Sequence, residues 1–216
     1  MRSIYLVMTV SLSIFSTPVW AGPNEGGVFI LHANESIDYA PGVDYCGQSG
    51  LVDCSSADTR VDEAGPQVLH TFGAFPAEND PRVLAVVFGI EYDEEITVID
   101  WGTCGDIEVL SGNEDGEPWP ASGSVAVVGW NTAQTDHLLE ILWLAATNDA
   151  GEPASISIVP TWIDHSASFG DDSVPTEIDD AVDLGRLGFF EDGYLPCPDA
   201  TPVQQSSWGA VKAFYR

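Results

Sequence analysis

Basic residues are scarce in this chain. Its 216 residues include 6 Lys and Arg against 34 Asp and Glu, which gives a formal net charge of −28. Sequence-independent binding of nucleic acid depends on basic residues that neutralise phosphates, so the charge excludes that function class. It also disfavours adhesion to anionic membrane surfaces. Three interpretations of the acidity stay open: solubility in a secreted and saline setting, calcium binding, and attraction of a cationic partner or substrate.

Apolar runs long enough to cross a bilayer, about 20 residues, are also lacking. The short apolar stretch at 4–15 follows a basic start and precedes the tripeptide VWA, whose outer residues fit the positions that a signal peptidase reads. We therefore expect residues 1–21 to be a secretion signal and the mature chain to begin at Gly22. Because position 22 is not Cys, a lipid anchor is not expected there. The predicted location is the medium or the cell surface, in a Gram-negative bacterium.

Internal repeats and low-complexity linkers are absent as well, so the chain reads as one domain. Hydrophobic residues make up 44% of it, and its seven Trp argue against a disordered acidic chain. We expect a single domain over 22–205, followed by a short amphipathic tail over 206–216 that carries Lys and Arg but no acid.

Short apolar runs separated by turn residues predict strands rather than helices. The segment 138–147 also has leucines at helical spacing, but its Trp and Ile and its position between strands favour a strand. A break in the alternation of 95–101 predicts a β-bulge. The run at 82–92 is apolar on both alternating faces, which is typical of a central strand covered on both sides. The fold class is an antiparallel β-sandwich of about eight or nine strands with long acidic loops; the expected strands are 27–33, 67–75, 82–92, 95–101, 124–130, 138–147, 153–160 and 184–190.

An even number of cysteines in an exported chain indicates two disulfides. The four are Cys46, Cys54, Cys104 and Cys197, and three pairings are open. The local pair Cys46–Cys54 with Cys104–Cys197 is favoured, because the first closes a short loop that contains two Gly. A zinc site is disfavoured, since no C-x2-C spacing occurs and no His lies near a Cys in the sequence.

The run LAVVFGIEYDEEITVIDW resembles strands of secreted bacterial cohesin-like and carbohydrate-binding-module-like domains. The matching positions are Phe88, Ile90, Tyr92, Asp93 and Val98. A later run, VAVVGWNTAQTDHLLEILWLAA, is similar to the second half of such a domain, so the resemblance covers about residues 67–160. It implies an immunoglobulin-like or jelly-roll sandwich whose role is binding, surface attachment or assembly rather than catalysis.

The tail SSWGAVKAFYR is similar to C-terminal tails on exported proteins of some Gram-negative lineages, where a terminal segment acts in sorting or anchoring. That resemblance rests on Trp208, Gly209, Lys212, Tyr215 and Arg216.

Acidic residues are densest near the C-terminal end of the domain. Carboxylates this close repel one another unless a cation or water separates them, so calcium is a candidate ligand for this cluster. The alternative is a solvated acidic loop. The predicted metal residues are Asp171, Asp172, Glu177, Asp179, Asp180 and Asp183.

Tryptophans in loops are candidates for stacking on sugars. Trp119 lies between two prolines and Trp162 lies beside Asp164 and His165, whereas Trp101, Trp130 and Trp143 fall in strands and are expected in the core.

Catalytic motifs are missing: the chain contains neither G-x-S-x-G nor H-E-x-x-H. We therefore expect no enzyme but a secreted binding module for adhesion, assembly or carbohydrate binding, with calcium as a candidate cofactor. Its partner would be an extracellular polysaccharide or a cell-surface protein. Two alternatives stay open: a filament or layer subunit that uses the strand at 27–33 as a donor edge, and a small secreted hydrolase in which two carboxylates, or a His and a Ser, converge on a pocket.

Overall fold

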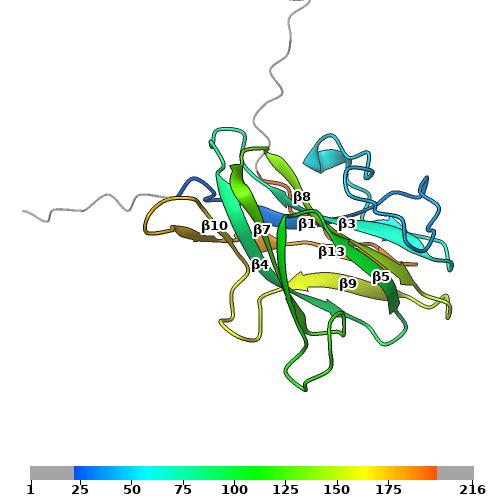
Figure 1. The fold of residues 1–216 in the computed structure, drawn as a ribbon. Coiled ribbons are helices and arrows are strands. Elements are labelled where there is room, and N and C mark those ends of the chain that lie inside the picture. Colours follow the sequence, from blue (N-terminus) through cyan, green and yellow to red (C-terminus); the bar gives the residue numbers. More distant parts are fainter. Residues whose placement is uncertain (1–21, 199–216) are drawn as a thin grey trace, which may run out of the picture.

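Two β-sheets stacked face to face make up the body of the protein in the computed structural model, which describes residues 22–198 (Figure 1). The predicted signal and the predicted tail lie outside these residues. The described part contains no α-helix and one 3₁₀ turn, η1 (Cys54–Ser56). Its strands are β1 (Val28–Ala33), β2 (Arg60–Val61), β3 (Gln67–Ala74), β4 (Val83–Tyr92), β5 (Thr97–Thr103), β6 (Ile107–Ser111), β7 (Ser124–Gln134), β8 (Leu138–Thr147), β9 (Ala154–Val159), β10 (Ser168–Gly170), β11 (Ile178–Asp180), β12 (Asp183–Leu184) and β13 (Arg186–Phe189).

The first sheet, sheet A, has the strand order β12-β1-β3-β8-β5. The second, sheet B, has the order β11-β10-β4-β9-β13-β2, with β7 on the other side of β4 and β6 beyond β7. Neighbouring strands are antiparallel except for the short parallel pairs β1–β12 and β13–β2. The all-β sandwich predicted from the sequence is therefore confirmed.

Each of the eight predicted strands has a counterpart, and 138–147 is the strand β8 rather than a helix. The predicted bulge is also present, because the pairing of β5 with β8 shifts between Val98 and Asp100. The sequence did not reveal β2, β6, β10, β11 and β12, which are short and depend on long neighbouring strands for their pairing. The proposal of β1 as a donor edge is wrong, because β1 pairs with β3 on one side and with β12 on the other.

The core lies between the sheets, where alternate side chains of both sheets meet. Phe29 of β1 stacks on Phe169 of β10 with 4.4 Å between ring centroids, and it contacts Phe88 of β4 at 5.1 Å. All three side chains are fully buried, and each contributes about 2–3 kcal/mol through the apolar area removed from water.

A long segment, residues 34–59, covers the outer face of sheet A (Figure 1, blue to cyan). Two disulfides hold it: Cys46–Cys104 ties it to the end of β5, and Cys54–Cys197 ties it to the C-terminal end of the described chain. The favoured pairing Cys46–Cys54 is therefore wrong. The segment crosses the sheet and brings each cysteine beside a partner that is distant in the sequence, with Cα atoms 5.5 and 5.7 Å apart.

Candidate functional site

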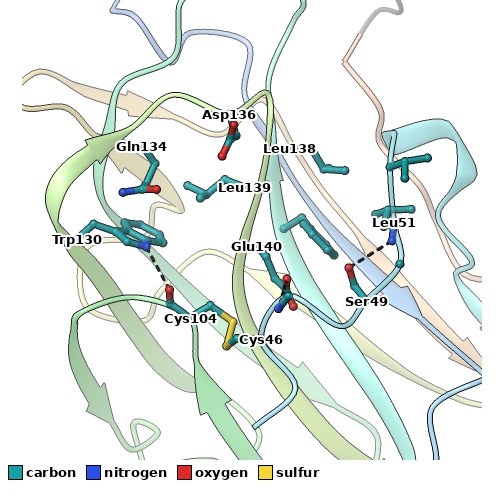
Figure 2. Close-up of a pocket in the computed structure, with 14 residues that line it drawn as sticks. Cys46, Ser49, Leu51, Cys104, Trp130, Gln134, Asp136, Leu138, Leu139 and Glu140 are labelled. Carbon is teal, nitrogen blue, oxygen red and sulfur yellow. Dashed lines mark hydrogen bonds between the residues drawn. A yellow bond between two sulfur atoms is a disulfide. The ribbon is translucent and has the colours of Figure 1, made fainter.

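A cavity of about 500 Å³ opens between the loop at 46–52 and the connection from β7 to β8 (Figure 2). Its wall combines the Cys46–Cys104 disulfide, apolar side chains and the acids Asp136 and Glu140. Glu140 is engaged in structural hydrogen bonds: one carboxylate oxygen lies 2.7 Å from Nδ1 of His70, and the other accepts from the Gly47 amide at 2.8 Å. His70 is fully buried and does not line the cavity. The cavity therefore holds a carboxylate that fastens a loop to the sheet, not a His and a Ser directed at one point.

A second candidate is the outer face of sheet B. Two rows of paired residues run straight across five strands of it, β6, β7, β4, β10 and β11. We call these ten residues the open face; the first row is Ile107, Gly129, Ala85, Gly170 and Ile178, and the second is Val109, Val127, Val87, Ser168 and Asp180.

The open face is apolar although the chain is strongly acidic. Asp180, at one end of the second row, is its single charged residue. Ile107, Val109 and Ile178 are 56%, 60% and 69% exposed. Within residues 22–198 no helix or strand packs across this face, in contrast to sheet A, whose outer face lies under the 34–59 segment. The exposed apolar side chains lie at the two ends of the face, whereas its middle is half-buried, and Gly129 and Ser168 there are buried. Exposed apolar side chains grouped on one face are a feature of interaction sites.

The centre of the first row is also flat. Gly129 and Gly170 lie on either side of Ala85 in the first row, so the three central positions carry at most one methyl group. Acids border the face at both ends, with Asp106 next to Ile107 and Glu177 close to Ile178. An apolar centre with an acidic border is the result.

The sequence analysis missed this face, and one of its expectations was wrong. The run at 82–92 became β4, a central strand, but only its inner side is covered by the core. Its outward residues Ala85 and Val87 belong to the open face. The sequence showed that both faces of this strand are apolar. That pattern alone does not tell whether the second face is buried in the protein or exposed as an interaction surface.

The predicted metal residues are placed apart, and several already have partners. Asp172 forms an ion pair with Arg82, Asp179 accepts from the Asn24 amide at 3.0 Å, and Asp183 accepts from the Tyr194 hydroxyl at 2.5 Å. Glu177 and Asp180 are exposed. Across residues 22–198, no three His, Cys, Asp or Glu side chains gather as a metal site would require. Calcium binding in this segment stays a prediction.

Asp171 differs from the other acids because it is only 3% exposed. One of its oxygens accepts from the Ser173 hydroxyl and from the Glu177 amide, both at 2.7 Å, and from the Ser173 amide at 3.1 Å. Burial opposes ionisation of this carboxyl, but the hydrogen bonds outweigh it and lower its pKa. Asp171 therefore stabilises the loop at 171–177 by accepting hydrogen bonds from two of its residues.

The tryptophans divide differently from the prediction. Trp119 is partly buried against the main core, whereas Trp162 is 40% exposed and donates from its indole nitrogen to the Gly112 carbonyl, just beyond β6. Trp130 and Trp143 are buried as expected. The expectation for Trp101 is wrong: it is 38% exposed, because it follows the bulge on an edge strand. Trp208, Lys212, Tyr215 and Arg216 lie outside the described residues.

Comparison with known proteins finds no matching family model and no matching curated protein. Within residues 22–198 no helix has the length and apolar character of a membrane span.

Among solved structures, the fold resembles cohesin modules. One belongs to a family 33 glycoside hydrolase of Clostridium perfringens, with 15% identity and a TM-score of 0.43 over 62% of this chain and 93% of that one. Another is the sixth cohesin of scaffoldin B from Acetivibrio cellulolyticus, solved in complex with a dockerin, with 13% identity and a TM-score of 0.42 over 62% of this chain and 94% of that one. The seventh ScaB type I cohesin of Pseudobacteroides cellulosolvens has 12% identity and a TM-score of 0.39 over 63% of this chain and 90% of that one. The resemblance to cohesins that the strand pattern suggested thus recurs in the fold, at a remote level.

Proposed function

We propose that the protein is a secreted, non-catalytic module that binds a partner protein through the open face. The observation that carries this proposal is the contrast between a chain of net charge −28 and ten adjoining sheet positions with one charge among them. Keeping acids off an exposed face has no benefit for solubility. It has a benefit for association, since burying an unpaired carboxylate in an interface is costly.

The chemistry of the face defines the kind of partner. The flat centre formed by Gly129, Ala85 and Gly170 fits an apolar surface that can approach the strands closely. The acidic border at Asp106 and Glu177, together with Asp180 at the end of the second row, favours a partner with basic residues around that surface. The open face carries no aromatic residue and few hydrogen-bonding side chains, so a protein suits it better than a polysaccharide.

The setting would be extracellular or at the cell surface. Two disulfides within residues 22–198 are typical of an oxidising compartment, and they agree with the predicted signal at 1–21. We infer a role in adhesion or assembly, in which the module joins its partner to the envelope or to a larger extracellular complex.

The test compares variants of the mature protein. I107E/V109E places two carboxylates on the open face, and V52E is the matched control, because Val52 is 84% exposed on the loop that covers sheet A. Proteins captured from the producing cells' envelope and medium are identified, purified and titrated against each variant. We expect affinity to fall by about tenfold or more in I107E/V109E and to be unchanged in V52E.

Equal affinities for all three proteins would overturn the proposal. Light scattering across a range of concentrations supplies a second readout. If the wild-type protein forms dimers that I107E/V109E abolishes, the open face joins two copies of this chain, and the partner-protein proposal fails.

A further inference from the structure

Asp179 carries a carboxylate on the inner side of an edge strand. It belongs to β11, at the margin of sheet B, and it pairs in register with Phe169 of β10, whose ring is buried in the core. Its side chain therefore faces inward and is half-buried, whereas its neighbours Ile178 and Asp180 belong to the open face. A charge in this position discourages pairing with a further strand, but it also needs a partner because it is partly removed from water.

No arginine or lysine of the described chain serves Asp179. Within residues 22–198 its carboxylate accepts one hydrogen bond, from the amide of Asn24 at 3.0 Å. That part of the chain contains no lysine, and its three arginines are paired with other carboxylates: Arg60 with Asp62 and Asp192, Arg82 with Asp172, and Arg186 with Glu191.

The turn at 22–27 brings Gly22 against this carboxylate. Asn24 is fully buried, and its side chain holds the backbone of Arg82 through two hydrogen bonds, of 2.9 and 3.2 Å. The Gly22 carbonyl accepts from the Glu25 amide at 3.2 Å, which closes the turn. Because Asn24 also donates to Asp179, the turn is held between the residue that precedes β4 and the edge strand β11.

Only glycine fits at the first position of this turn. A Cβ on Gly22 would lie 2.6 Å from the carboxyl carbon of Asp179 and would overlap both carboxylate oxygens. The Gly22 nitrogen is bonded to the same Cα, so a charge on that nitrogen lies within a few ångströms of the carboxylate. While residue 21 remains attached, the nitrogen is an uncharged amide.

We propose that cleavage of the predicted signal creates the cation that Asp179 lacks: the Gly22 nitrogen becomes an ammonium that binds the Asp179 carboxylate. A signal peptidase adds water across the Ala21–Gly22 amide and breaks its C–N bond. The proton of the new Ala21 carboxyl goes to the Gly22 amine, which is protonated below its ordinary pKa of about 7.7–8.0. The ion pair fastens β11 to the N-terminal turn. This inference rests on cleavage after Ala21 and not on the open face or its partner.

The test is a pH titration of the mature protein by NMR with isotope-labelled glycine. Chelator is present, so that no calcium occupies the carboxylate. The Gly22 Cα resonance is assigned by its failure to titrate in an Nα-acetylated sample. We expect its titration midpoint to lie about half a pH unit higher in the wild type than in D179N, because a nearby carboxylate favours the charged amine. The matched control is D180N, which removes the adjacent, exposed acid of the same strand and should stay close to the wild type.

Amide hydrogen exchange supplies a second measurement that needs no substitution. The Nα-acetylated chain keeps an uncharged nitrogen, as the uncleaved chain does. At neutral pH its amides in β11 should exchange about threefold faster than those of the free mature chain, because the edge strand has lost one of its fastenings.

Three results would overturn the proposal. Equal titration midpoints in the wild type and D179N would show that Asp179 does not hold the ammonium. Equal exchange in the acetylated and free chains would show that the charge does not fasten β11. Mass spectrometry of the exported protein that finds a first residue other than Gly22 would remove the ammonium from this position.

Discussion

Glu140 of β8 lies 2.7 Å from Nδ1 of His70 on β3, so a contact between two neighbouring strands holds the carboxylate that also binds the loop over sheet A. The same carboxylate accepts from the Gly47 amide through its other oxygen. Because a carboxylate oxygen only accepts, the proton lies on Nδ1 of His70. Nε2 of His70 is buried without a partner in the described part of the chain, so the ring depends on Glu140 for its hydrogen bonding.

Removing this carboxylate should destabilise the fold. E140A leaves the buried His70 ring and the Gly47 amide without their partner, and we expect a loss of about 2 kcal/mol in the free energy of unfolding. E140Q, which keeps an acceptor oxygen, should lose less. Urea denaturation followed by circular dichroism measures both, with the exposed Glu94 changed to Gln as the control. An E140A variant as stable as the E94Q control would show that the contact contributes nothing.

Stability should decline between neutral pH and about pH 5, and His32 is one cause. Burial lowers the pKa of His32, although the Ser49 carbonyl opposes this effect. Its Nδ1 accepts from the Asp58 amide at 3.0 Å, and the His70 ring and the Asp58 carboxylate are the neighbouring titratable groups. The folded pKa is depressed, so between about 6.5 and that lower value only the unfolded chain binds a proton at this position, and stability falls as the pH falls.

The H32N variant tests this prediction, because an amide oxygen can still accept from the Asp58 amide but does not titrate. Melting temperatures from pH 7 to pH 5 should depend less on pH in H32N than in the wild type. Asp53, Asp62, Asp164, Asp171 and Asp172 have lowered pKa values, so their contributions to stability are present at neutral pH and are lost mainly below about pH 5, beneath this range. Parallel curves for H32N and the wild type would rule His32 out.

The two disulfides should contribute unequally to stability. Cys54–Cys197 spans 143 residues of sequence separation and Cys46–Cys104 spans 58, so the chain-entropy model assigns about 5 kcal/mol to the first and slightly less to the second. C54S/C197S should therefore lower the urea midpoint at least as much as C46S/C104S. Mass spectrometry of unreduced peptides checks the pairing itself, and recovery of a Cys46–Cys54 peptide would contradict the structure.

Asp171 should be needed for the loop at 171–177, because D171A removes the acceptor of three hydrogen bonds from Ser173 and Glu177. We expect a loss of about 2 kcal/mol in the free energy of unfolding, read from thermal melts beside the exposed control E177Q.

The same melts with millimolar calcium or with chelator test the calcium prediction. A rise in melting temperature with calcium that D179N/D180N abolishes would support a cation site here. Identical melting temperatures with calcium and with chelator would contradict calcium binding in this segment.

The sequence by itself determined the class of fold and part of its detail. Alternation with a period of two is a local property, so it identified the eight main strands, the strand at 138–147 and the bulge within β5. The net charge follows from composition alone, so it excluded sequence-independent nucleic-acid binding without knowledge of the fold.

The tertiary structure alone decided which surfaces meet. Cys46 pairs with Cys104 because the 34–59 segment crosses sheet A, and Trp101 is exposed because it follows a bulge on an edge strand. The open face arises because the covering segment lies over sheet A and not over sheet B. A periodic pattern states that a side is apolar, but whether another part of the chain covers that side depends on long-range packing, which no local pattern encodes.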